Sequence, residues 1–172
     1  GAVYALAFAP NGDLYIGGYF TNADGTYGDY LCYWDGSAFN RVGTVELSTN
    51  GYVYALAFGA TGWLYVGGDF TSAGGIANAD YIARWNGSNW ESLGTGTNEA
   101  VWGLAVNSGK VYAYGDFTSA GGLALTDRVA IWSNGAWQPL DVDLPGTATV
   151  AAILPASDGS LYIGVTFSTL AE

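Results

Sequence analysis

The chain has 172 residues, of which 50% are hydrophobic and 16% aromatic, so it is long and apolar enough to bury a core. Fifteen acidic residues against four basic ones give a formal net charge of −11, which repels phosphate backbones and anionic lipid headgroups. Nucleic acid and acidic membrane surfaces are therefore poor candidates as partners, and we expect no nucleic acid to bind. No run approaches the roughly 20 apolar residues that span a bilayer, so we expect no membrane insertion.

One stretch occurs four times and sets the period of the chain. Its copies are 14–21, 64–71, 111–118 and 161–168, and each contains a phenylalanine. Phe20, Phe70, Phe117 and Phe167 are separated by 50, 47 and 50 residues, a length typical of propeller blades rather than of helical repeats. We divide the chain into repeats 1–50, 51–98 and 99–147 and a half repeat 148–172, all within one domain. Gly1 aligns with Gly51, which indicates a processed chain or a segment of a longer one.

Each full repeat predicts four short strands joined by turns. The first repeat opens with an apolar strand at 3–8, and further strands follow at 14–20, 30–34 and 38–42. The second repeat places its strands at 53–58, 63–70, 81–85 and 89–93, and the third at 101–106, 111–117, 128–132 and 136–140. The fourth supplies strands at 150–154 and 161–167 only. The 27 glycines fit many tight turns, and the fold class is predicted to be all-β.

These residues carry a family resemblance. A strand ending in Gly-Gly, a polar loop, a strand ending in Trp and a turn followed by a second aromatic resemble the kelch-type repeat of galactose-oxidase-like β-propellers. Secreted bacterial proteins that repeat the pattern GDFT, AGG and IARWNG are more similar still. The chain departs from the pattern at Tyr19, Tyr114 and Val165. The resemblance implies a β-propeller of four-stranded antiparallel blades, about three and a half of them in this chain.

Three and a half blades do not close a ring, because propellers use roughly 4 to 8. We expect further repeats or a neighbouring chain to complete the ring, since an unpaired strand would otherwise expose an aggregation-prone edge. This predicts a protein partner, either the chain itself or additional repeats. The favoured function is a non-enzymatic extracellular or cell-surface scaffold, in a surface or filamentous assembly or in a longer secreted protein. A glycan-binding propeller of the lectin type is the alternative.

Catalysis is not expected from the residue inventory. The chain contains no histidine, which removes the imidazole ligands of a galactose-oxidase-like copper site and the commonest general base. Arg41, Arg84 and Arg128 occupy unrelated repeat positions, unlike the arginine cluster with which sialidase-like propellers hold a carboxylate. The single Cys32 aligns with Ala83 and Ala130 and is predicted to be a small buried thiol.

Binding residues can still be proposed from the loops that follow the second strand of each repeat. The candidate carboxylates are Asp69, Asp80, Asp116 and Asp127. Asp69 aligns with Asp116 and Asp80 with Asp127, which favours a structural role performed once per repeat. Carboxylate and carbonyl oxygens are also the ligands of Ca²⁺, but no EF-hand spacing occurs, and no other cofactor is expected. For a glycan, the off-pattern aromatic residues Trp63 and Tyr27 are the candidates to face a sugar ring.

Overall fold

All regular secondary structure that the structure describes is β-strand. The computed structural model describes residues 1–23, 25, 28–43, 51–124, 128–140, 144 and 148–166. No helix occurs in these ranges, and most of the strands belong to four-stranded antiparallel sheets. The prediction of an all-β fold is confirmed.

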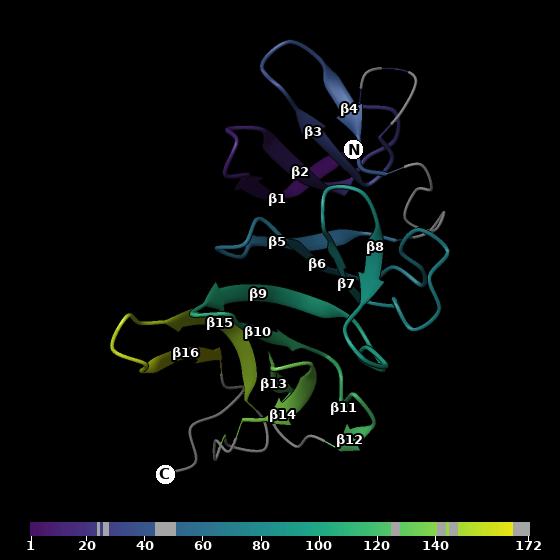
Figure 1. Cartoon of the computed structure of the whole chain (residues 1–172). Helices are drawn as coiled ribbons and strands as arrows, with labels where there is room; N and C mark the ends of the chain where they lie inside the picture. Colours follow the sequence, from purple (N-terminus) through teal and green to yellow (C-terminus); the bar gives the residue numbers. More distant parts are fainter. Residues whose placement is uncertain are drawn as a thin grey trace.

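Three four-stranded sheets follow one another along the chain (Figure 1). The first contains β1 (Ala2–Phe8), β2 (Leu14–Tyr19), β3 (Leu31–Trp34) and β4 (Phe39–Arg41). The second contains β5 (Val53–Phe58), β6 (Leu64–Gly68), β7 (Ile82–Trp85) and β8 (Trp90–Ser92). The third contains β9 (Val101–Asn107), β10 (Lys110–Gly115), β13 (Val129–Ser133) and β14 (Ala136–Pro139). In each sheet the strands pair in chain order, so the first strand of a repeat always lies at one edge.

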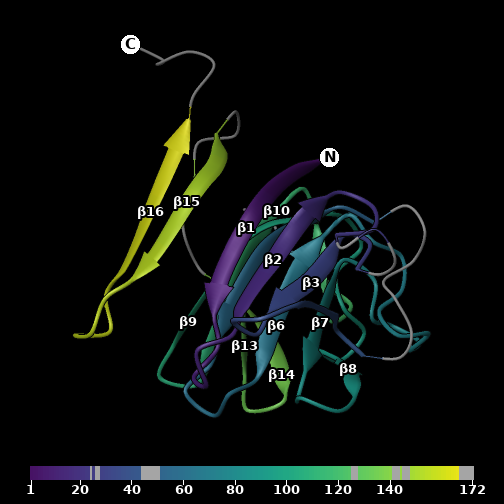
Figure 2. The same ribbon diagram turned by 90° about the horizontal axis from the view of Figure 1, so that it is seen from above.

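Two hairpins complete the described strands. A small hairpin of β11 (Ser119–Ala120) and β12 (Leu123–Ala124) lies in the loop between β10 and β13. The second hairpin pairs β15 (Thr149–Pro155) with β16 (Leu161–Thr166). β15 packs against β9 and β10, and Figure 2 shows the hairpin to one side of the three sheets.

Each repeat holds its third strand in place through one residue with left-handed backbone geometry. Tyr30, Tyr81 and Arg128 stand directly before the third strand and have φ angles of 63°, 61° and 56°. Their carbonyls accept hydrogen bonds from Gly18, Gly68 and Gly115, the second residues of the recurring glycine pairs or their equivalents. The hydrogen bond recurs in all three sheets, which offsets a backbone conformation that is costly for a bulky residue.

The sheets stack face to face, and the glycines of the second strand make close packing between them possible. A side chain at Gly17 would collide with Val53 of the next sheet, and a side chain at Gly67 would collide with Val101. Both valines are fully buried. One apolar core lies between the first and second sheets and another between the second and third.

Tryptophans of the third and fourth strands also belong to these cores. Trp85 and Trp90 pack over Gly43, and Trp132 packs over Gly94. Trp137 donates a hydrogen bond from Nε1 to the carbonyl of Leu93 at 2.7 Å. Trp85 and Trp132 are buried, whereas Trp34, at the equivalent position of the first sheet, is only partly buried. Cys32 is buried, as predicted for a thiol that aligns with alanines.

Candidate functional site

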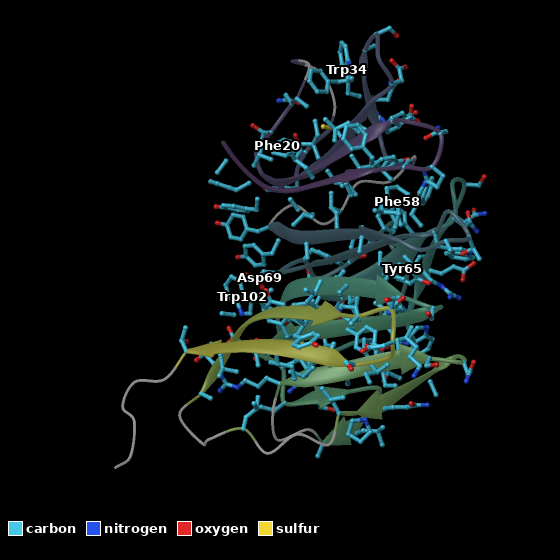
Figure 3. The ribbon with its side chains drawn as sticks, turned by 90° about the vertical axis from the view of Figure 1, so that its left-hand side faces the viewer. Phe20, Trp34, Phe58, Tyr65, Asp69 and Trp102 are labelled. Carbon is cyan, nitrogen blue, oxygen red and sulfur yellow. The ribbon has the colours of Figure 1, made fainter. Side chains whose placement is uncertain are left out.

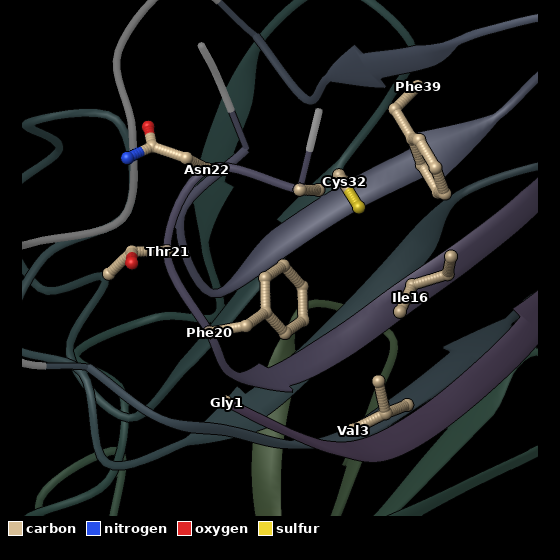
Figure 4. Close-up of a pocket in the computed structure, with 9 residues that line it drawn as sticks. Gly1, Val3, Ile16, Phe20, Thr21, Asn22, Cys32 and Phe39 are labelled. Atoms are coloured by element: carbon tan, nitrogen blue, oxygen red, sulfur yellow. The ribbon is translucent and has the colours of Figure 1, made fainter. Parts of the chain in front are cut away.

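The outer face of the first sheet is a large exposed apolar surface. Val3, Leu6 and Phe8 project from β1 away from the second sheet, and 56%, 60% and 71% of their surfaces are accessible. Beside them is a pocket of about 320 Å³, whose walls include Ile16, Phe20, Cys32 and Phe39 (Figure 4).

The equivalent positions of the second sheet show what this face resembles. Val53 stands where Val3 stands, and it is fully buried under the first sheet. Phe58 matches Phe8 and packs edge-on against Tyr15 of the first sheet, with ring centroids 5.1 Å apart. The residues equivalent to Ile16, Phe20, Cys32 and Phe39 are likewise buried: Val66, Phe70, Ala83 and Trp90. The outer face of the first sheet is therefore half of an intersheet core. We call it the open face.

A second surface feature lies at the first strand of each repeat, where every strand carries a β-bulge. The pairing shifts between Val3 and Ala5, and an equivalent shift occurs in β5, β9 and β15. The extra residues are Tyr4, Tyr54, Trp102 and Ala151. A bulge turns its extra residue away from the regular alternation of the strand, and bulges are enriched beside functional sites.

Three of the four bulge residues form a row of rings across the sheets. The centroids of Tyr4 and Tyr54 are 5.7 Å apart, and those of Tyr54 and Trp102 are 4.4 Å apart with an interplanar angle of 24°. We call these three residues the bulge row. Together with Tyr114 and the small residues that follow each bulge, they line a groove of about 350 Å³.

Polar side chains stand next to the bulge row. Asp69 and Asp116 directly follow the second strands β6 and β10. The Asp116 carboxylate lies 3.7 Å from the Arg128 guanidinium. In the first sheet an aromatic pair, Tyr19 and Tyr30, takes the places of Asp116 and Arg128. Figure 3 shows Asp69 and Trp102 toward the same end of the sheets, with Phe58 and Tyr65 toward the other.

Two tyrosines near this end, Tyr54 and Tyr81, have raised pKa values. Burial, followed by the negative charge of Asp69 and the neighbouring Tyr4, raises the pKa of Tyr54 to about 12. Burial also raises the pKa of Tyr81, and the carboxylates of Glu99, Asp69 and Asp80 add to the shift. The site therefore offers phenolic hydroxyls and carboxylates side by side at neutral pH, a combination that can bind hydroxyl groups.

The residues predicted from the sequence fall in separate places. Asp69 and Asp80 both lie near Tyr81, and Asp69 and Asp116 both lie near Tyr54. Trp63 precedes β6, at the opposite end of that strand from Asp69. The Cζ atom of Arg84 lies over its ring, 4.3 Å from the centroid. Tyr27 and Asp127 lie outside the described residues.

Within the described ranges, no group of three or more His, Cys, Asp or Glu side chains is arranged to hold a metal ion. Asp29, at the position equivalent to Asp80, forms a local hydrogen bond. Its Oδ1 atom accepts from the backbone N–H of Asn22 at 2.7 Å. Through this contact the Asp29 side chain holds its own loop by a bond to the backbone.

Sequence reasoning missed the bulge row. Tyr4, Tyr54 and Trp102 occupy the same position of their repeats, whereas only the off-pattern residues Trp63 and Tyr27 were predicted to face a ligand. A signal for the bulge is present in the sequence. Two apolar residues that face the core are three positions apart instead of the two or four of a regular strand, and an aromatic residue follows the first of them. The sequence shows this in Val-Tyr-Ala-Leu of the first two repeats and Val-Trp-Gly-Leu of the third.

Comparison with known proteins finds similarity of fold. No protein-family model matches the chain, and no curated protein matches it. A solved structure that matches is the extracellular domain of a candidate one-component system from B. thetaiotaomicron, with a TM-score of 0.66 and 14% sequence identity. The alignment covers 96% of this chain and 20% of that chain, so this chain spans about a fifth of its length. Among the residues described, no helix has the length and apolarity to cross a membrane.

Proposed function

We propose that this chain is part of an extracellular β-propeller that acts as a non-enzymatic interaction scaffold. The observation that carries the proposal is the contrast between Val3, 56% exposed on the open face, and its equivalents Val53 and Val101, which are fully buried. Repeats of this kind bury their apolar faces on one another. A further four-stranded unit of the same repeat is therefore the partner whose chemistry fits the open face.

The arrangement of the first strands supports a radial rather than a linear stack. β1, β5, β9 and β15 all contribute to the same groove. They do so with equivalent residues, since Ala5, Ala55, Gly103 and Ala152 line it together with Leu6, Leu56, Leu104 and Ile153. Strands that converge in register on one line are expected around the axis of a propeller.

Placement outside the cell and the lack of catalysis rest on independent grounds. The neighbour with a similar fold is an extracellular domain, and a net charge of −11 suits a soluble surface module. The absence of histidine from the sequence removes the residue that most often performs acid and base chemistry at neutral pH. The surfaces described above are apolar and aromatic, which suits binding.

Sedimentation velocity of the 172-residue chain at several concentrations tests the proposal. The open face is expected to pair with another copy, so the weight-average mass should rise with concentration above the 17.9 kDa of the monomer. The double variant Leu6→Asp, Phe8→Asp places charges on the open face and should shift the population to monomer. A wild-type chain that stays a monodisperse 17.9 kDa monomer contradicts the proposal.

A matched control distinguishes association through the open face from non-specific hydrophobic association. Leu123 is also an exposed leucine, but it lies on β12, away from β1. Leu123→Asp should leave the concentration dependence unchanged. If Leu123→Asp shifts the population to monomer as much as the double variant does, association does not depend on the open face and the proposal fails.

A further inference from the structure

The bulge row has one vacant position. Each of the four first strands carries a bulge, but the fourth bulge residue is Ala151, which has no ring. The row of Tyr4, Tyr54 and Trp102 therefore ends at Trp102, which stacks on Tyr54 with one face. Among the described residues it makes no second ring contact, and 44% of its surface is accessible.

The residues around Trp102 are held by a hydrogen bond and by close packing. Tyr114 donates a hydrogen bond from its hydroxyl to the carbonyl of Ala151 at 2.9 Å and so ties β15 to the third sheet beside the row. A side chain at Gly103 would overlap the Tyr114 ring, so the glycine directly after Trp102 makes room for that ring. The groove around Trp102 is thus lined by the ring of Tyr114 on one sheet and by Ala152 of β15.

Groups that can bind hydroxyls occur along the first strands and directly after β10. β1, β5, β9 and β15 each pair with a strand on one side only, so their other edges carry backbone donors and acceptors without a strand partner. Asp116 and Arg128 form an exposed ion pair. Asp116 directly follows Gly115, the last residue of β10, which pairs with Val101 of β9. The oxygen and nitrogen atoms of the ion pair face solvent near the start of β9.

We propose that Trp102 and the groove at the Ala151 position form a binding site for a pyranose ring of a neutral glycan. The apolar face of the sugar stacks on the free face of the indole, as the next ring of the bulge row would. Its hydroxyls bond to the strand edges and to Asp116 and Arg128. Sugar-binding sites typically combine an aromatic face with carboxylates and backbone polar groups.

Charge decides between neutral and acidic glycans. The chain has a net charge of −11, and Asp69 and Asp116 both lie close to the row. A uronic acid or sulfated sugar would meet repulsion from both carboxylates, whereas a neutral sugar gains hydrogen bonds from them. The site uses residues of the described chain alone and stands whether or not the open face is covered.

The test measures binding of the 172-residue chain to neutral hexasaccharides of glucose, mannose, galactose and xylose, by calorimetry and by tryptophan fluorescence. At least one sugar should bind and change the fluorescence. Trp102→Ala should weaken that binding at least about tenfold, because the stacking face is lost, and Trp102→Phe should weaken it less. Ala151→Trp should abolish it by filling the vacant position with a ring of the protein itself.

Trp63→Ala provides the control, since Trp63 lies at the other end of β6 under Arg84. It should bind as the wild type does. The proposal is overturned if none of the four sugars binds at millimolar concentration, if Trp102→Ala binds unchanged, or if Trp63→Ala loses binding. Thermal unfolding of each variant verifies its fold, and Trp102→Phe keeps the test informative if either Trp102→Ala or Ala151→Trp unfolds.

Discussion

At the scale of single residues, packing between sheets depends on a glycine in the second strand. A Cβ atom at Gly67 would lie 2.7 Å from Cγ1 of Val101, a fully buried side chain of the third sheet. We expect Gly67→Ala to destabilise the chain by about 1 to 3 kcal/mol, because the core must shift to admit the methyl group. The free energy of unfolding from urea titration measures this.

The fourth repeat offers a matched control for that substitution. Gly164 stands at the equivalent position of β16, where the nearest heavy atom to an added Cβ is Ala152 Cβ at 3.5 Å. This is ordinary van der Waals contact, so Gly164→Ala should leave the stability nearly unchanged. Equal losses in the two variants would show that the cost comes from the strand backbone and not from the contact with Val101.

At the scale of elements, side-chain hydrogen bonds attach the hairpin of β15 and β16 to the third sheet. Two of them run from Tyr114 to the Ala151 carbonyl and from Asn107 Nδ2 to the Ala156 carbonyl at 2.8 Å. Tyr114→Phe removes the first bond and keeps the ring over Gly103. A typical net value for such a bond is about 0.5 to 1.5 kcal/mol.

We therefore expect Tyr114→Phe to speed amide hydrogen exchange in β15 and β16 by roughly 2-fold to 10-fold and to leave β5 to β8 unchanged. Tyr162→Phe serves as the control, because Tyr162 is exposed on the hairpin itself. Faster exchange throughout the chain would mean that the hydroxyl supports the whole fold and not the attachment of the hairpin.

The strands were largely predictable from the sequence, because turns and apolar runs are local signals. The strand expected at 14–20 is β2 at Leu14–Tyr19, and the one expected at 81–85 is β7 at Ile82–Trp85. The bulges were not predicted, since a bulge is defined by the residues paired on the neighbouring strand. The β11 to β12 hairpin was missed because it has only two residues in each strand.

The candidate site was less predictable for the same reason. Recurrence of an aromatic residue indicates that every repeat uses it, but not whether it faces the core or solvent. Trp85 and Trp132 recur and are buried, whereas Trp102 recurs with Tyr4 and Tyr54 and is exposed. Trp63 was singled out because it does not recur, and the structure places it beneath Arg84.

At the scale of the whole molecule, two terms oppose each other when copies associate. The open face is apolar and favours association, while a net charge of −11 on each copy opposes it. The electrostatic range falls from about 30 Å at 0.01 M salt to about 3 Å at 1 M, whereas burial of apolar surface is not screened. The balance should therefore move toward association as salt is added.

We expect the apparent dissociation constant from sedimentation equilibrium to fall as sodium chloride is raised from about 0.01 M to about 1 M. The Leu6→Asp, Phe8→Asp variant should remain monomeric across this range, because screening reduces repulsion without restoring the apolar contact. Sodium sulfate should act more strongly than chloride, since it also strengthens the burial of apolar surface. Association that weakens with salt would instead indicate contacts between opposite charges, and only four basic residues are present in the chain to make them.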